Sequence, residues 1–188
     1  MSSAVQDSSS ETSSSTLWTI GHSTRSADEF SRMLRANVIL NLVDVRSYPG
    51  SRRFPHFNTQ PLSESIARHG MQYYHLPELG GRRQASPNSH NTAWGNPSFR
   101  AYADHMESAE FEEGINQLLT LATKRRTTIM CAEALWWRCH RSLIADHLKA
   151  NGCEVIHIVG EKKTEIHPFT SAARIIDGKL SYEGLFAG

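Results

Sequence analysis

Thiols, a carboxylate, an imidazole and two guanidiniums lie close together in the stretch TTIMCAEALWWRCHRSLIADHL. Cys131 and Glu133 follow a short apolar run, and Arg138, Cys139 and His140 open the segment after it. A thiolate can act as a nucleophile, a carboxylate or an imidazole can carry a proton, and a guanidinium can bind an anion. These residue types therefore predict a nucleophilic or acid–base site that also holds a negative charge.

The hydrophobic pattern indicates which elements position these groups. Short, nearly continuous apolar runs are typical of strands covered on both faces of a parallel sheet. The expected strands are 17–20, 38–45, 71–76, 127–131 and 154–159. Caps and amphipathic spacing predict helices between them, at 26–37, 61–70, 97–107, 109–124 and 138–150. Asp177 and Gly178 predict a tight turn in a small terminal hairpin.

This alternation of strands and helices predicts an α/β fold, a three-layer sandwich with a mainly parallel sheet of about five strands. Polar residues follow three of the strands: His22 and Ser23 the first, Asp44 and Arg46 the second, and Cys131 the fourth. Open α/β sheets bind ligands at the carboxyl edge of their strands. We therefore expect these side chains to share one cleft.

The expected roles follow from that placement. The leading hypothesis is an enzyme that acts on a phosphorylated or nucleotide-like anionic small molecule. Cys131 would be its nucleophile. The unpaired backbone amides of a helix that begins near Arg138 would form the anion site. The expected catalytic residues are Cys131, Glu133, His140 and Asp44. The expected substrate-binding residues are His22, Ser23, Arg46, Arg52, Arg138 and Arg141. Cys139 is expected to be a small buried core residue.

A nucleic-acid-binding module without its own chemistry is the main alternative. Residues 46 to 83 contain six arginines, no lysine and only two glutamates, and aromatic residues alternate with arginines between Arg46 and Phe57. Arginines can hold phosphates while aromatic rings stack on bases. The net charge of +1 is too close to neutral for a strong duplex binder.

Three further interpretations compete with these two. Cys131, Cys139 and His140 with a fourth ligand could hold zinc, but adjacent residues on a helix point about 100° apart, so we predict no metal site. A phosphatase or sulfur-transferase loop would need five residues between cysteine and arginine, and six separate Cys131 from Arg138. An adaptor with purely structural polar residues is the third. The sequence leaves it unknown whether a cofactor is used.

Composition sets the outer bounds. The chain of 188 residues is 39% hydrophobic and 21% charged, which is typical of a globular protein. The serine-rich residues 1–16 are expected to be a disordered tail, and 17–188 a single α/β domain. We expect a cytoplasmic protein with no membrane partner and free thiols, because the sequence shows neither a secretory signal nor a membrane-length apolar run. The oligomeric state is left open.

Four separate blocks of the sequence, TIGHS, DVRSYPGSRRFPHF, LGGRR and MCAEALWWRCHRSLIADHL, resemble in order and spacing those of the domain-of-unknown-function family number 488. The resemblance covers roughly residues 17 to 170. It includes the C-A-E pattern that begins at Cys131 and the C-H-R pattern that begins at Cys139. The resemblance implies a compact α/β domain of mostly prokaryotic cytoplasmic proteins, and it implies no settled activity.

Overall fold

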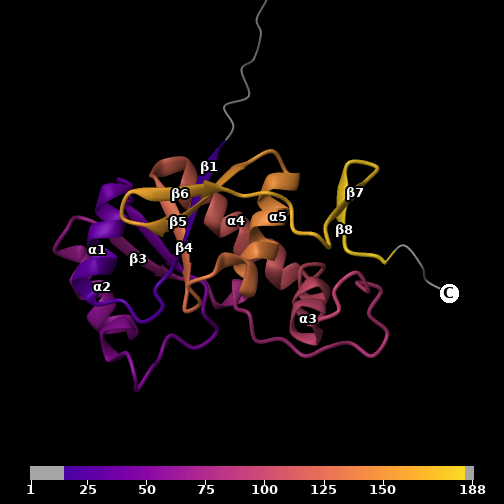
Figure 1. Ribbon diagram of the computed structural model, residues 1–188, viewed down its shortest axis with the longest axis horizontal. Coiled ribbons are helices and arrows are strands. Elements are labelled where there is room, and N and C mark those ends of the chain that lie inside the picture. The colour runs from indigo at the N-terminus through magenta and orange to yellow at the C-terminus, as the bar shows by residue number, and fades with distance from the viewer. Residues whose placement is uncertain (1–14, 185–188) are drawn as a thin grey trace, which may run out of the picture.

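A six-stranded sheet forms the middle layer of the computed structural model, which describes residues 15–184 (Figure 1). The strand order is β3-β2-β4-β1-β5-β6, in which β1 to β5 are mutually parallel and β6 is antiparallel to β5. The strands are β1 (Thr16–Gly21), β2 (Asn41–Asp44), β3 (Gln72–His75), β4 (Thr127–Cys131), β5 (Glu154–Gly160) and β6 (Lys163–Ile166). A separate hairpin joins β7 (Arg174–Ile176) and β8 (Lys179–Ser181).

Helices cover both faces of the sheet. They are α1 (Ala27–Ala36), α2 (Thr59–Ala67), α3 (Pro97–His105), α4 (Ala109–Lys124) and α5 (Arg141–Ala150), with short 3₁₀ turns at Pro55–Phe57, Pro77–Leu79 and Trp136–Arg138. In Figure 1 α1 and α2 lie on one side of the strands, and α4 and α5 lie on the other. The predicted three-layer α/β fold with a mainly parallel sheet is confirmed.

The buried side chains form two cores, one on each side of the sheet. Leu17, Val43 and Ile129 pack toward α3, α4 and α5, while their neighbours Trp18 and Leu42 pack toward α1 and α2. Successive strand residues point to opposite faces, so a central strand such as β1, β2 or β4 must be buried on both faces to fill both cores. This requirement explains the continuous apolar runs of the sequence, and it assigns each residue near a strand end to one face.

The helix ends follow local capping chemistry. Ser26 precedes α1 and its hydroxyl oxygen accepts the backbone N–H of Glu29 at 3.1 Å, as the S-x-x-E spacing predicts. Asn96 caps α3 and Ser108 caps α4 in the same way. No carboxylate or hydroxyl caps α5, since His140 takes the N-cap position.

Several predicted boundaries shift. The second strand begins at Asn41 rather than 38, because Val38 turns the chain with φ 54° and is exposed. The last long helix begins at Arg141 rather than Arg138, which lies in a 3₁₀ turn. The polar edge strand β6 was not expected, so the sheet has six strands. The predicted hairpin is present, with Asp177 and Gly178 at positive φ.

Residues 1–14 lie outside the described residues, so the expected tail is untested there, and Thr16 already belongs to β1. Within residues 15–184, no helix combines the length and the apolar character that crossing a membrane requires.

Candidate active site

The carboxyl ends of β1 and β4 lie directly beside each other, and Gly21 pairs with Cys131. The backbone N–H of His22 donates to the carbonyl of Cys131 at 3.0 Å. A Cβ atom placed on Gly21 would lie 1.8 Å from the carbonyl oxygen of Glu133. Only glycine therefore lets the loop after β4 cross the end of β1, and this crossing fixes where Cys131 and Glu133 lie.

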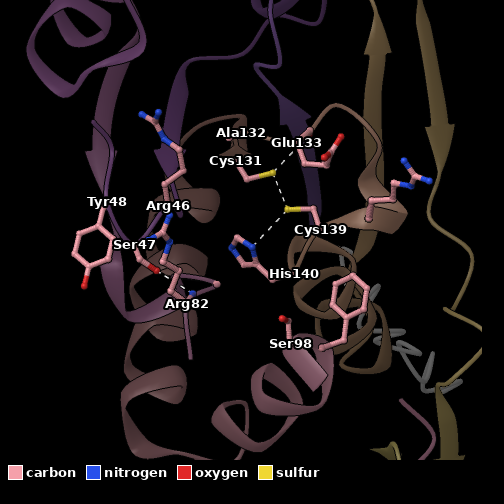
Figure 2. Close-up of a pocket in the computed structure, with 13 residues that line it drawn as sticks. Arg46, Ser47, Tyr48, Arg82, Ser98, Cys131, Ala132, Glu133, Cys139 and His140 are labelled. Atoms are coloured by element: carbon pink, nitrogen blue, oxygen red, sulfur yellow. Dashed lines mark hydrogen bonds between the residues drawn. The ribbon is translucent and has the colours of Figure 1, made fainter. Parts of the chain in front are cut away.

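A pocket of about 340 Å³ opens at this edge of the sheet. Five of the predicted site residues line it: Arg46, Cys131, Glu133, Arg138 and His140. Figure 2 shows that the Cys131 and Cys139 sulfurs point toward each other at its centre, with Arg46, Ser47 and Tyr48 on one side and Ser98 of α3 below. Residues distant in the sequence thus share one cavity.

The two cysteines form the core of the site. Their Sγ atoms are 2.7 Å apart, and both thiols are free and buried. Burial raises the pKa of Cys131 well above its ordinary value, and the hydrogen bond to Cys139 raises it further. Burial also acts to raise the pKa of Cys139, but a hydrogen bond from Cys131, the charge of Arg141 and the backbone N–H of Arg141 outweigh it and hold this pKa below its ordinary value. Cys139 is the thiol that ionises first.

His140 supplies a proton acceptor for Cys139. Its Nε2 is 3.1 Å from the carbonyl oxygen of Val45, which can only accept, so Nε2 carries the hydrogen. The lone pair of Nδ1 therefore faces Sγ of Cys139, at 3.4 Å (Figure 2). Burial lowers the pKa of His140, which keeps the ring neutral and able to accept the thiol proton.

Arg141 lies beneath the pocket rather than in its wall. The side chain is 1% exposed, and its Nη2 donates to the carbonyls of Glu133 and Ala134, both at 2.8 Å. Its Nε and Nη1 are buried without a hydrogen-bond partner, and no carboxylate of residues 15–184 forms an ion pair with it. A buried cation without a carboxylate favours a negative charge nearby, and the charge of Arg141 acts, against burial, to lower the pKa of Cys139.

Asp44 is engaged on the other side of the sheet. It follows Val43, which packs toward α4 and α5, so its own side chain points to the α1 and α2 face. Its carboxylate accepts from Nε and Nη2 of Arg46 at 2.6–3.1 Å and from the hydroxyl of Tyr73 at 2.7 Å. Asp44 does not line the pocket, and Arg46 has its side-chain donors committed to Asp44 and to neighbouring groups.

His22 supports the same ion pair. Its Nδ1 donates to the carbonyl of Ser23 at 2.9 Å, so Nε2 accepts from Nη1 of Arg46 at 3.3 Å. Burial lowers the pKa of His22 to about 4. The ring stacks on buried Phe57 at 4.2 Å between centroids. Neither His22 nor Ser23 lines the pocket, and the exposed Arg52 lies outside it as well.

The pocket also contains Tyr48 and Arg82, which come from the arginine-rich segment 46–83. Tyr48 is 73% exposed, and the guanidinium of Arg82 lies 5.6 Å from the centre of its ring. The guanidiniums of Arg82 and Arg138 have no hydrogen-bond or ion-pair partner among the described residues, and both side chains are exposed. Positive charge was expected of Arg46, Arg138 and Arg141, and in the pocket wall it comes, free of such partners, from Arg138 and from Arg82.

A second polar network lies buried under α5. Tyr182 and Thr170 donate to the carboxylate of Asp146, which also accepts from Nε2 of His167 at 2.9 Å. Nδ1 of His167 therefore accepts from Nε2 of His157 at 2.9 Å. Burial lowers the pKa of His157 to about 2. The sequence did not predict this network, because Asp146, His157 and His167 come from separate segments and no spacing links them.

Ligands for a metal ion do not converge in this region. Across residues 15–184 no three His, Cys, Asp or Glu side chains are placed to hold one ion together.

The comparison with known families is consistent with this geometry. Residues 26–148 match the family described as Domain of unknown function DUF488. The chain belongs to this family. No curated protein and no solved structure gives a significant match.

The DUF488 match ends within α5 and covers all of the residues that line the pocket. It contains both cysteines of the thiol pair, Glu133, His140 and all of the lining arginines. His22 and Ser23 lie before the matched range, and His157 and His167 of the second network lie after it. The match is therefore shorter than the resemblance expected from the sequence blocks, which begins at β1.

Proposed function

We propose that this DUF488 chain is an enzyme that uses a cysteine thiolate on a phosphorylated or nucleotide-like anionic substrate. One observation carries the proposal. The sulfur of Cys139, with a proton acceptor and a buried cation beside it, lines the same pocket as Arg82 and Arg138, whose guanidiniums have no hydrogen-bond or ion-pair partner among the described residues.

The roles differ from those expected from the sequence. Cys139 is the nucleophile, because its pKa is lowered and its thiol proton faces Nδ1 of His140. Cys131, the nucleophile expected from the sequence, donates a hydrogen bond to the Cys139 thiolate, because its own pKa is raised. Glu133 is exposed at the pocket wall, where its carboxylate can exchange protons with a leaving group.

Substrate binding rests on the two free guanidiniums. Arg82 and Arg138 come from separate segments that line the pocket, the loop after β3 and the turn before α5. A guanidinium offers planar paired donors that match the oxygens of a phosphate. A phosphoryl group held between them lies against the thiol pair, and Tyr48 can cover the rest of the ligand.

Thermal melting with a ligand panel tests binding. Inorganic phosphate, nucleoside monophosphates and sugar phosphates are added at increasing concentration, and we expect at least one class to raise the melting temperature. A ligand present at 100 times its Kd stabilises by about 2.7 kcal/mol, which equals roughly 5–10 °C for a chain of this size.

Matched variants locate the effect. The Arg82→Ala/Arg138→Ala double variant should lose the shift, while Arg35→Ala, which removes an exposed arginine at the end of α1, should retain it. Cys139→Ser should still bind and should lose turnover of the ligand identified. An absent shift across the whole panel, or a shift that survives in the double variant, would contradict the anion site.

The exposed ring of Tyr48 beside Arg82 favours a second candidate, binding of single-stranded nucleic acid without chemistry. Phe57, which was expected to stack on bases, is fully buried, so the stacking surface is smaller than the sequence suggested. Salt-dependent binding to short single strands that is lost in an Arg52→Ala/Arg53→Ala variant would support this candidate. Absence of binding at low salt would remove it.

A further inference from the structure

We propose that Cys131 and Cys139 form a peroxide-reactive dithiol, in which Cys139 attacks a small hydroperoxide and Cys131 then closes a disulfide with it. This activity goes beyond the proposed function and shares with it only the assignment of Cys139 as the nucleophile.

The first argument is geometric. Cys131 is the last residue of β4, Cys139 lies in the turn before α5, and their Sγ atoms are 2.7 Å apart. A disulfide bond is about 2.05 Å long, so the sulfurs need to approach by only about 0.7 Å. Two features hold these segments together. The loop after β4 crosses over Gly21, and Arg141 donates hydrogen bonds to the same loop. The pair is thus prearranged for bond formation.

The second argument is that the two thiols are unequal. Burial acts to raise the pKa of both thiols, but at Cys139 the neighbouring Cys131, the charge of Arg141 and the backbone N–H of Arg141 outweigh it and hold the pKa below its ordinary value, whereas the pKa of Cys131 is raised. The surroundings of the two sulfurs also differ, because Nδ1 of His140 lies 3.4 Å from the Cys139 sulfur, while the Cys131 sulfur lies 3.6 Å from the carbonyl oxygen of Glu133. The reactive thiol and the resolving thiol of a peroxide site need this difference, because the first must be ionised and the second must attack only after oxidation.

The third argument is access. Both cysteines are more than nine-tenths buried, yet both line the pocket. A small hydroperoxide can enter this pocket of about 340 Å³ and reach either sulfur. The remaining cysteine, Cys153, lies at a different pocket between α4 and α5 and serves as an internal control.

The proposed steps balance. His140 takes the thiol proton, the Cys139 sulfur attacks the terminal oxygen of ROOH, the O–O bond breaks, and the leaving alkoxide recovers the proton as ROH. Cys139 is then a sulfenic acid. The Cys131 sulfur attacks the Cys139 sulfur, the S–S bond forms, and the released hydroxide leaves with the Cys131 proton as water. The two thiols supply both electrons, and a dithiol reductant restores them.

Thiol counting after stoichiometric hydrogen peroxide tests the proposal. The protein is oxidised, denatured, alkylated and weighed intact. We expect three alkylated cysteines before oxidation and one after it, which peptide mapping assigns to Cys153, with full recovery after a dithiol reductant. The Cys153→Ser variant retains only Cys131 and Cys139, and both of these thiols should be lost after the same peroxide treatment. Because this variant leaves the pair untouched, the test holds even if a change at Cys131 or Cys139 prevents folding.

Single variants separate the two roles. In Cys131→Ser the oxidised Cys139 should persist as a sulfenic acid that a cyclic dione reagent traps, and in Cys139→Ser no such adduct should form at Cys131. Three alkylatable cysteines after peroxide, or oxidation of Cys153 as fast as that of the pair, would overturn the proposal. No anionic ligand enters this experiment, so a failed ligand panel leaves its result intact, and a failed oxidation leaves the anion site intact.

Discussion

Replacing Gly81 by alanine tests whether His140 activates Cys139. A Cβ atom on Gly81 would lie 2.4 Å from Nδ1 of His140, whereas ordinary contacts begin at about 3.4 Å. The imidazole ring must therefore retreat by about 1 Å. Its Nε2 is held by the carbonyl of Val45 at 3.1 Å and its Nδ1 faces Cys139 at 3.4 Å, so a shift of that size breaks at least one of these contacts.

Two magnitudes follow. Overpacking of a filled site costs about 1–3 kcal/mol of the free energy of unfolding, so the melting temperature of Gly81→Ala should fall by several degrees. A hydrogen bond between neutral groups contributes about 1 kcal/mol, which corresponds to about fivefold in rate. We therefore expect alkylation of Cys139 by iodoacetamide at neutral pH to be about fivefold slower than in the unchanged protein.

The assay follows modification of each cysteine by peptide mass, with Cys153 as the internal reference. Gly95→Ala is the matched control, because a Cβ atom at Gly95 meets nothing within 4 Å and the residue does not have a positive φ. A Gly81→Ala variant that is destabilised but alkylates at the original rate would refute the role of His140. Unchanged stability would refute the close packing itself.

Further predictions concern the buried polar groups. Asp44→Asn should lower the free energy of unfolding by about 3–5 kcal/mol in urea denaturation, because it leaves the Arg46 guanidinium buried without its counter-charge; a cost under 1 kcal/mol would contradict this. Asp146→Asn should cost about 3 kcal/mol, because the carboxylate accepts several buried donors, and a melting temperature equal to that of the original protein would argue against it. Acid should destabilise the fold through His22 and His157, whose pKa values in the folded state are about 4 and about 2. Below pH 6.5 these histidines bind protons in the unfolded chain but remain neutral in the folded state, so stability falls as the pH falls. Each histidine should remove roughly 3 kcal/mol by pH 4, and denaturation midpoints that do not change between pH 7 and pH 4 would contradict this.

Much of the fold was predictable because each strand must fill two cores. That requirement produces uninterrupted apolar runs, and the caps at Ser26 and Asn37 mark the first helix without any tertiary information. Strand β6 escaped prediction because it lies at an edge, where polar residues such as Lys163 and Glu165 face solvent and no apolar run is needed. The start of α5 was misplaced because Arg138 ends a 3₁₀ turn and Cys139 has an extended backbone between that turn and the helix.

The candidate site was only partly predictable. Parallel topology brings the strand ends to one edge, so the meeting of Cys131, Glu133 and His140 follows from the strand order. The face of the sheet to which a strand residue points depends on side-chain alternation. Asp44 follows the core residue Val43, so its side chain must point away from the pocket. The difference between the two thiols depends on the position of Arg141 and on the contact between the cysteines, so the types and spacing of the residues alone did not favour Cys139.

The pH dependence of cysteine alkylation tests the central claim most directly. Native protein is treated with iodoacetamide from pH 5 to pH 10, and the rate at each cysteine is measured by peptide mass. The account predicts that Cys139 reacts fastest and that the midpoint of its profile lies below the ordinary thiol pKa of about 8.5. A midpoint for Cys139 at or above that of Cys153, or no reaction at Cys139 in the native protein, would contradict it.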